Sequence, residues 1–294
     1  MNTPQNETAR SAPRRRTRLE DTWRQFRKNK GAIVGSVLIL LLAGIALAAP
    51  LAAPEGLDDQ HLGRRFQAPS RENILGTDNL GRDILSRIIH GSRLSLSIGF
   101  ITTSIGLVAG GSLGAIAGYY GGNKDQVIMR FMDIILAIPG FIFAVALVTA
   151  LGPNLLNLMI AVGLNSIPYF ARIIRSSVLS VKEEEYIQAA RVLGCSNGWI
   201  IVKHVIPNAF APILVQATLR IGDTIIIAAG LSFLGLGAQP PLPEWGAMLS
   251  AGRQYLRDAW WMATFPGIAI MITVLAFNLV GDGLRDALDP RLKS

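Results

Sequence analysis

The sequence predicts an all-α polytopic membrane protein with six transmembrane helices. Hydrophobic residues make up 50% of the 294 positions and charged residues only 16%, against roughly 25% in a typical soluble domain. Several apolar stretches reach the ~20 residues that a helix needs to cross a bilayer. Many of the glycines and prolines lie inside these stretches, where membrane helices tolerate them.

The apolar stretches place the spans in order. The first covers about 31–49, and its length, together with the proline that follows it, favours an uncleaved anchor over a cleaved signal peptide. Pro139 should bend the third span, because proline removes a helical hydrogen bond. The other five spans are expected at about 94–117, 127–151, 155–174, 211–236 and 260–280.

The distribution of charge predicts the orientation of these spans. The net charge is +8, and basic residues are concentrated in residues 1–30. Directly before a span, such a tail marks the cytoplasmic side, so no nucleic-acid partner is expected. With six spans, both termini are cytoplasmic, the polar segments 54–93 and 237–259 are external, and the polar segment 176–207 is cytoplasmic.

No motif indicates that this chain is an enzyme. The glycines at 121–122 lack the spacing and the following hydroxyl of a phosphate-binding loop. The sequence has no Ser/His/Asp arrangement in a plausible setting, and its three scattered histidines have no metal-site spacing. We expect no catalytic residue, no metal and no cofactor in this chain, so any energy source is a partner.

Four glycines repeat at every fourth position of the second span: Gly106, Gly110, Gly114 and Gly118. On a helix they form a strip without side chains, which lets another helix approach closely. Packing inside the helical bundle is favoured. A subunit interface and a helix that lines a transport pathway are the alternatives.

Arg220 and Asp223 are charged residues within the fifth span, three positions apart on one helical face. A charge in mid-membrane costs about 2.5–3.5 kcal/mol on insertion scales, so the two side chains should face each other or face water. They form either a structural ion pair inside the bundle or part of a transport pathway or subunit interface.

The polar segment 176–207 is unusually ordered for a membrane loop. Three glutamates at 183–185 favour a helix start. Tyr186, Ala189, Ala190 and Leu193 have helical spacing and share one face. Gly194 should end this helix.

A second short helix is expected to follow the first. Ser196 or Asn197 would cap its start, and Pro207 would end it. Two short helices along the membrane surface, bounded by glycine and proline, form a rigid docking surface for a partner.

The docking segment carries a family resemblance. Gln188-Ala189-Ala190, Gly194 and the run from His204 to Pro207 resemble the EAA loop of ABC importer permeases. Gln188 stands where the usual motif has glutamate, His204 where it has isoleucine and Ile206 where it has leucine. Segments 75–96, 231–249 and 276–292 resemble the C-type permease subunit of dipeptide and oligopeptide importers.

The resemblance implies the type I ABC importer permease fold. A basic cytoplasmic tail (1–30) and a first span with its external loop (31–93) would precede a transmembrane domain at 94–285, and 286–294 would be a cytoplasmic tail. The coupling residues would be Gln188, Ala189, Ala190, Gly194, Ile206 and Pro207.

The same resemblance implies a complex in the cell membrane of a prokaryote. A second homologous permease would form the other half of the pathway, two cytoplasmic ABC ATPases would bind ATP and Mg²⁺, and an external binding protein would deliver the substrate. Dipeptides or oligopeptides are the expected cargo. Nickel, glutathione and oligosaccharide are alternatives for the same type of permease, and an ion-coupled carrier is the alternative from another class.

Overall fold

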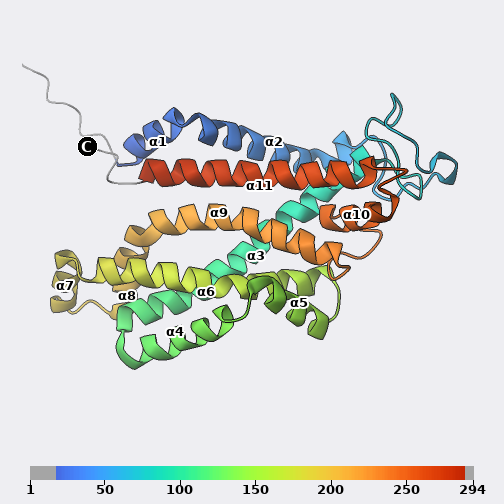
Figure 1. Cartoon of the computed structure of the whole chain (residues 1–294). Coiled ribbons are helices and arrows are strands. Elements are labelled where there is room, and N and C mark those ends of the chain that lie inside the picture. The colour runs from blue at the N-terminus through green and yellow to red at the C-terminus, as the bar shows by residue number, and fades with distance from the viewer. Residues whose placement is uncertain (1–17, 289–294) are drawn as a thin grey trace, which may run out of the picture.

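The computed structural model describes residues 18–288, which contain helices and irregular segments but no strand (Figure 1). The basic residues before position 18 and the residues after 288, on which part of the topology prediction depends, lie outside this range. The main helices are α1 (Arg18–Lys28), α2 (Lys30–Ala52), α3 (Ile84–Tyr120), α4 (Gly122–Leu136), α5 (Gly140–Leu151), α6 (Leu155–Lys182), α7 (Glu185–Val192), α8 (Asn197–Ile200), α9 (Ile206–Phe233), α10 (Trp245–Gly252) and α11 (Trp261–Leu288).

The helices confirm the prediction of an all-α protein with six membrane spans. Five are long and apolar enough to cross a bilayer: α2, α3, α6, the continuous stretch 197–233, and α11. The pair α4 and α5, taken together, is the sixth candidate span and is bent by 87° at its break. The bend lies at Pro139, as predicted. It separates two helices rather than kinking one, because proline also disfavours helical backbone at the preceding residue.

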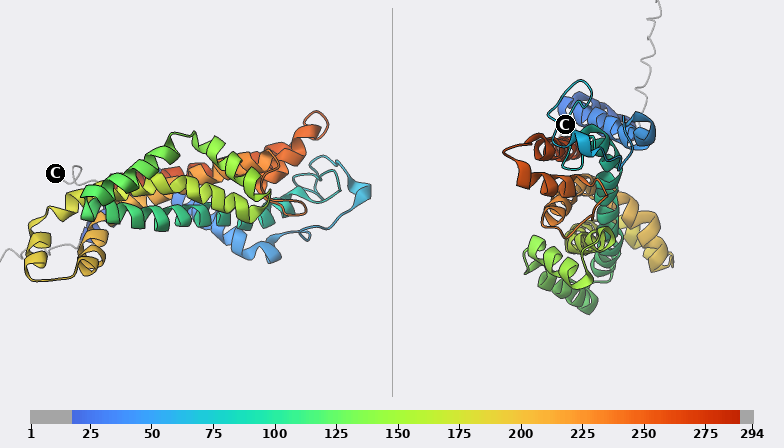
Figure 2. Two further views of the ribbon diagram at one scale, coloured as in Figure 1. Left: turned by 90° about the horizontal axis from the view of Figure 1, so that it is seen from below. Right: turned by 90° about the vertical axis from the view of Figure 1, so that its right-hand side faces the viewer.

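The spans pack side by side, with α9 in contact with both α11 and α6, while α2 packs on α11 and α3. Figure 1 shows α7 and α8 at the same end of the molecule as α1 and the end of α11. The loop before α3 and helix α10 lie at the opposite end, and a view turned by 90° shows the same separation (Figure 2, left).

The glycine strip of α3 faces α6 inside the chain. A Cβ atom at Gly110 would lie 2.3 Å from the carbonyl oxygen of Ile167, and one at Gly114 would lie 2.3 Å from that of Ala171. At Gly106 and Gly118 the nearest atoms belong to Ser166 and Arg175 of the same helix α6. The two helix backbones therefore touch.

Three element boundaries differ clearly from those predicted from the sequence. Helix α6 continues to Lys182 rather than ending near position 174, so the first residues of the polar segment 176–207 belong to this helix. Helix α3 begins at Ile84, so the external loop ends at Asp83 rather than near position 93. Asp83 caps the helix by accepting from the backbone nitrogen of Ser86 at 2.7 Å. Helix α11 continues to Leu288 rather than ending near position 280.

The outer loops are held by buried ion pairs. Arg82 donates from Nε to Asp78 at 2.7 Å and from Nη1 to Asp58 at 2.9 Å. Trp245 at the start of α10 is fully buried, and its indole Nε1 donates to the carbonyl oxygen of Ile88. The ion pairs of Arg82 hold the loop before α3 together, and the Trp245 hydrogen bond joins α10 to the second turn of α3. Asp78 and Asp58 also neutralise Arg82, a basic residue that the positive-inside rule would not place on this side.

Candidate functional site

Helix α7 (Glu185–Val192) lies within the polar segment 176–207 that the sequence predicts as a docking surface. Gly194 ends it with φ of +79°, a left-handed conformation that favours glycine. The backbone nitrogen of Cys195 donates to the carbonyl oxygen of Ala190 at 3.1 Å. This is the hydrogen bond of a Schellman C-terminal cap, so the helix ends where the glycine predicts.

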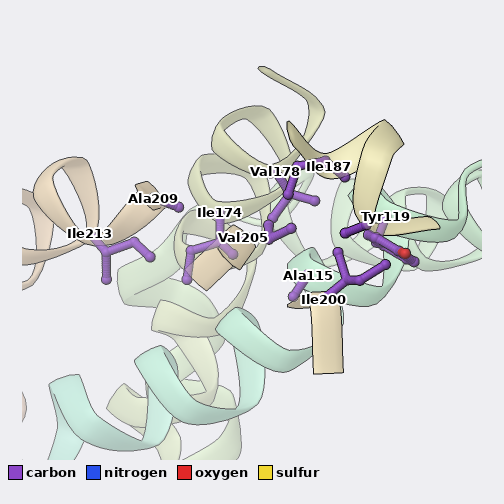
Figure 3. Close-up of a cluster of buried hydrophobic side chains, with 10 residues drawn as sticks. Ala115, Tyr119, Ile174, Val178, Ile187, Ile200, Val205, Ala209 and Ile213 are labelled. Atoms are coloured by element: carbon purple, nitrogen blue, oxygen red, sulfur yellow. The ribbon is translucent and has the colours of Figure 1, made fainter. Parts of the chain in front are cut away.

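The inner face of this segment is anchored in a hydrophobic core (Figure 3). Ile187, Ile200 and Val205 are each fully buried, and Ala190 is 9% exposed. These side chains pack against a set of residues from α3 and α6: Ala115, Tyr119, Ile174 and Val178. The segment is therefore fixed to two membrane helices, and a force applied to it is transmitted to both.

The second short helix, α8, is capped by Ser196, which accepts from the backbone nitrogen of Trp199 at 3.4 Å. Asn197 was the alternative cap. Its side-chain oxygen instead accepts from the hydroxyl of Tyr119 at 2.8 Å. This bond ties the start of α8 to α3.

Pro207 does not end the second helix, contrary to the sequence prediction. A single turn of π-helix (Ile201–Val205) joins α8 to α9, and Ile206 donates its backbone N–H to the carbonyl oxygen of Ile201. Pro207 then lies in the first turn of α9, directly after the π-helical turn, and the helix continues through it without its N–H donor. The docking segment and the fifth span are thus one continuous helical unit.

The outer face of the segment exposes apolar side chains. Val192 and Leu193 are 88% and 82% exposed. Of the six coupling residues expected from the resemblance, Ala190 is buried and the other five are exposed: Gln188, Ala189, Gly194, Ile206 and Pro207. The structure therefore places Ala190 on the buried inner face of the segment and leaves the other five residues exposed.

Arg220 and Asp223 lie together on α9. Arg220 Nη1 is 3.4 Å from Asp223 Oδ2, and the Arg220 guanidinium lies 3.9 Å from the ring centroid of Tyr169 on α6. Arg220 is 7% exposed, whereas Asp223 has a side chain that is 55% exposed. Sequence reasoning missed Tyr169, because its contact with Arg220 joins two helices that are far apart along the chain.

A groove of about 640 Å³ lies at the end of the bundle that carries α7. It is lined by residues of α6, α9 and α11: Ile173, Asn208, Ala211, Pro212, Val215, Gln216, Leu219, Arg285 and Leu288. Gln216 and Leu219 precede Arg220 and Asp223 by one helical turn on α9, and Ile173 follows Tyr169 by one turn on α6. The groove therefore ends beside the charged pair.

At the opposite end, a cavity of about 250 Å³ lies between the loop before α3 and α10. Arg82 lines it, and its hydrogen bond to Asp58 keeps the pKa of the Asp58 carboxyl below its ordinary value. Glu244 caps α10 by accepting from the backbone nitrogens of Gly246 and Ala247, and burial raises the pKa of its carboxyl. Sequence analysis assigned Glu244 no role, although a carboxylate before a helix start is a capping signal.

The side chains of residues 18–288 are not positioned to form a metal site. No group of three or more His, Cys, Asp or Glu side chains is placed to hold a metal ion in that part of the chain. What the structure offers is mechanical: a stiff segment joined to three membrane helices, an exposed apolar face on it, and a groove that leads to a charged pair within the membrane.

Comparisons with known proteins agree with this arrangement. Residues 110–294 match the family described as binding-protein-dependent transport system inner membrane component, and residues 17–69 match the N-terminal TM domain of oligopeptide transport permease C. The fold is similar to that of the MetNI methionine ABC transporter in inward-facing conformations, with a TM-score of 0.58, 18% identity, and coverage of 70% of this chain and 98% of that chain.

Curated relatives match over almost the whole chain. The dipeptide transport system permease protein DppC of Alkalihalophilus pseudofirmus is 50% identical, covering 93% of this chain and 90% of its own length. The glutathione transport system permease protein GsiD of Pectobacterium atrosepticum is 45% identical, covering 95% of this chain and 93% of its own length. The chain therefore belongs to the family of binding-protein-dependent transport system inner membrane components, which are the membrane-embedded, non-catalytic permease subunits of bacterial ABC importers.

Proposed function

We propose that this chain is the C-type permease subunit of an ATP-driven importer of dipeptides and short oligopeptides. It forms half of the transmembrane pathway and pairs with a second, homologous permease. Two cytoplasmic ATPases bind ATP and Mg²⁺, and an external binding protein delivers the peptide. The transmembrane domain is 94–285, extended outward by the first turns of α3. The first span with its loop (31–93), the basic tail (1–30) and the end of the chain (286–294) flank it.

The observation that carries the coupling mechanism is the two-sided docking segment, 183–207. Its inner face is buried against α3 and α6, and its outer face exposes Leu193, Val192 and Ala189. An exposed apolar face on a rigid base is typical of a surface that a partner covers. An ATPase subunit that grips this face moves α3, α6 and α9 together, which is a rigid-body transition between inward-facing and outward-facing states.

Gln188 takes the place of a glutamate in the usual motif, and its environment supports a structural contribution. Its side-chain Nε2 donates to the carbonyl oxygen of Glu183 at 3.3 Å. We infer that Gln188 helps to close the start of α7 and that contact with the ATPase does not need a charge at this position.

The peptide cargo is supported by the relatives that are named for it, since dipeptide and di/tripeptide permeases are 50% and 45% identical to this chain. Glutathione is the second candidate, because GsiD proteins reach 45% identity. Glutathione is itself a tripeptide with free carboxylates, so the two candidates share a chemistry. Nickel has less support, because no metal-ligand cluster occurs in residues 18–288.

Uptake into right-side-out or reconstituted vesicles, with the ATPases and ATP on the inside, tests the proposal. With the cognate ATPases, the second permease and the binding protein, labelled dipeptide should accumulate only when ATP is supplied. Competition between dialanine and glutathione then separates the two cargo candidates. Uptake that persists without the ATPases, driven by an ion gradient, would refute the importer function and favour an ion-coupled carrier.

A further inference from the structure

Arg220 is a buried cation whose neutralisation within the chain is incomplete. The residue is 7% exposed in the middle of a membrane span. Among residues 18–288 its ion pair is with Asp223, and the distance from Nη1 to Oδ2 is 3.4 Å, which is longer than the ~2.7–2.9 Å of a strong charge-assisted hydrogen bond. An arginine carries five N–H donors and is always charged, so most of its donor capacity is still available.

The free donors of Arg220 lie on one edge of the guanidinium. Nε and Nη2 are buried and have no acceptor among residues 18–288. These two nitrogens carry parallel N–H bonds, the fork that binds both oxygens of a carboxylate. A buried donor without an acceptor is unfavourable, so the site favours an acceptor from outside the described residues.

Two neighbours orient this fork. Tyr169 lies against the face of the guanidinium, with 3.9 Å between the guanidinium carbon and the ring centroid. Asp223 holds the opposite edge through Nη1. Tyr169 and Asp223 are both partly exposed, at 38% for the tyrosine and 55% for the aspartate side chain. The two nitrogens of the fork are therefore buried themselves, but they lie beside residues that reach the surface of the bundle.

A groove in the structure comes within one helical turn of Arg220, although Arg220 itself does not line it. The groove of about 640 Å³ opens at the end of the bundle that carries α7, and its lining residues Gln216 and Leu219 lie one turn from Arg220 and Asp223 on α9. Its volume falls in the ~300–1,000 Å³ range of small-molecule sites. Every unmodified dipeptide carries a terminal carboxylate that matches the fork.

The geometry points to Arg220 as a specificity-determining contact in the transport pathway, which binds the C-terminal carboxylate of the passing peptide through Nε and Nη2. Tyr169 and Asp223 are positioning residues that hold the guanidinium in place. This inference rests on the proposed peptide cargo. Through this contact, Arg220 selects transported molecules that carry a carboxylate, in addition to the selection made by the external binding protein.

The test uses the complete transporter reconstituted in vesicles, with dialanine and its C-terminal amide as probes. For wild-type protein and R220Q, uptake of each probe gives a preference ratio. Any preference of the binding protein is the same in both preparations and cancels when the two ratios are compared. We expect R220Q to reduce this preference for the free carboxylate at least tenfold. Arg27→Gln, which removes an exposed charge on α1, is the matched control and should leave the ratio unchanged.

Other outcomes have distinct meanings. Failure of the wild-type transporter to accumulate dialanine contradicts the peptide cargo itself. If R220Q lowers uptake of both probes by the same factor, Arg220 has only a structural role and the inference is wrong. If R220Q no longer co-purifies with the second permease, the fork belongs to a subunit interface. If R220Q does not assemble in the membrane, Arg220→Lys decides: it keeps the charge, loses the fork, and should still lower the ratio several-fold.

Discussion

Replacement of Gly114 by alanine isolates the contact between α3 and α6. The new Cβ atom would lie 2.3 Å from the carbonyl oxygen of Ala171, where an ordinary contact needs at least 3.4 Å. The helix backbones must then separate by about 1 Å at this point, because a carbonyl oxygen within a helix cannot rotate away. Such overpacking costs about 1–3 kcal/mol, and it outweighs the ~0.5–1 kcal/mol that alanine contributes over glycine in a helix.

Two other glycines in membrane helices provide matched controls. At Gly44 in α2, a Cβ atom meets nothing within 4 Å, so Gly44→Ala should be neutral or stabilising by up to about 1 kcal/mol. At Gly111 in α3, the nearest atom is the flexible Cδ1 of Ile174 at 2.9 Å, so Gly111→Ala should be intermediate. From the most to the least stable variant, the expected order is Gly44→Ala, Gly111→Ala and Gly114→Ala.

The assay is thermal unfolding of the purified protein in detergent, with all variants at one concentration. A difference of 1–3 kcal/mol between the Gly44 and Gly114 variants corresponds to a shift in Tm on the order of several degrees. If Gly114→Ala melts together with Gly44→Ala, the backbone contact between α3 and α6 does not exist in the protein and the reasoning fails.

Three further predictions concern the docking segment and the outer loops. Leu193→Asp should reduce co-purification of the ATPase at least tenfold without lowering the Tm, because Leu193 is 82% exposed; Leu62→Asp, exposed at the opposite end of the molecule, should have no effect on this readout. Ala190→Arg should instead unfold the segment locally, because Ala190 packs in the core beside Ile187, and faster proteolysis between residues 183 and 205 would show it; resistance equal to wild type would mean that this core does not anchor α7. Because Arg82 lowers the pKa of Asp58, the stabilisation should be present above the ordinary pKa of 3.8 and disappear as the pH falls through the lower folded-state value; Asp58→Asn should therefore have a lower Tm than wild type at neutral pH but not in strong acid, and a difference that is constant with pH would contradict the ion pair.

Features that depend on residues close in sequence could be predicted. The end of α7 at Gly194 and the cap of α8 at Ser196 follow from local preferences that neighbouring residues do not override. The start of α3 at Ile84 was missed, although Asp83 is a good capping residue. Polar residues such as Arg87 made the first turns of α3 resemble a loop. These turns are buried by contacts with Asp78 and with α10, and no local sequence pattern reveals such contacts.

For the candidate site residues, too, the sequence predicted some features and missed others. The pattern of residues 188–207 predicted a docking segment, but it did not distinguish the buried Ala190 from the exposed Gln188 and Ala189. Helical spacing placed Arg220 and Asp223 on one face. It did not show that the ion pair between them is long, or that Tyr169 completes the site.

The sequence by itself determined the family and predicted the number of spans and the position of the polar segment 176–207. Each can be recognised from residues that are close together in the chain, because a bilayer selects apolar stretches by length and a family motif is a run of residue types. Only the tertiary structure decided that the glycine strip meets α6 and which edge of Arg220 lacks a partner. These depend on the relative rotation and distance of helices that are far apart in the chain, and a shift of about 1 Å between two helices is enough to change them.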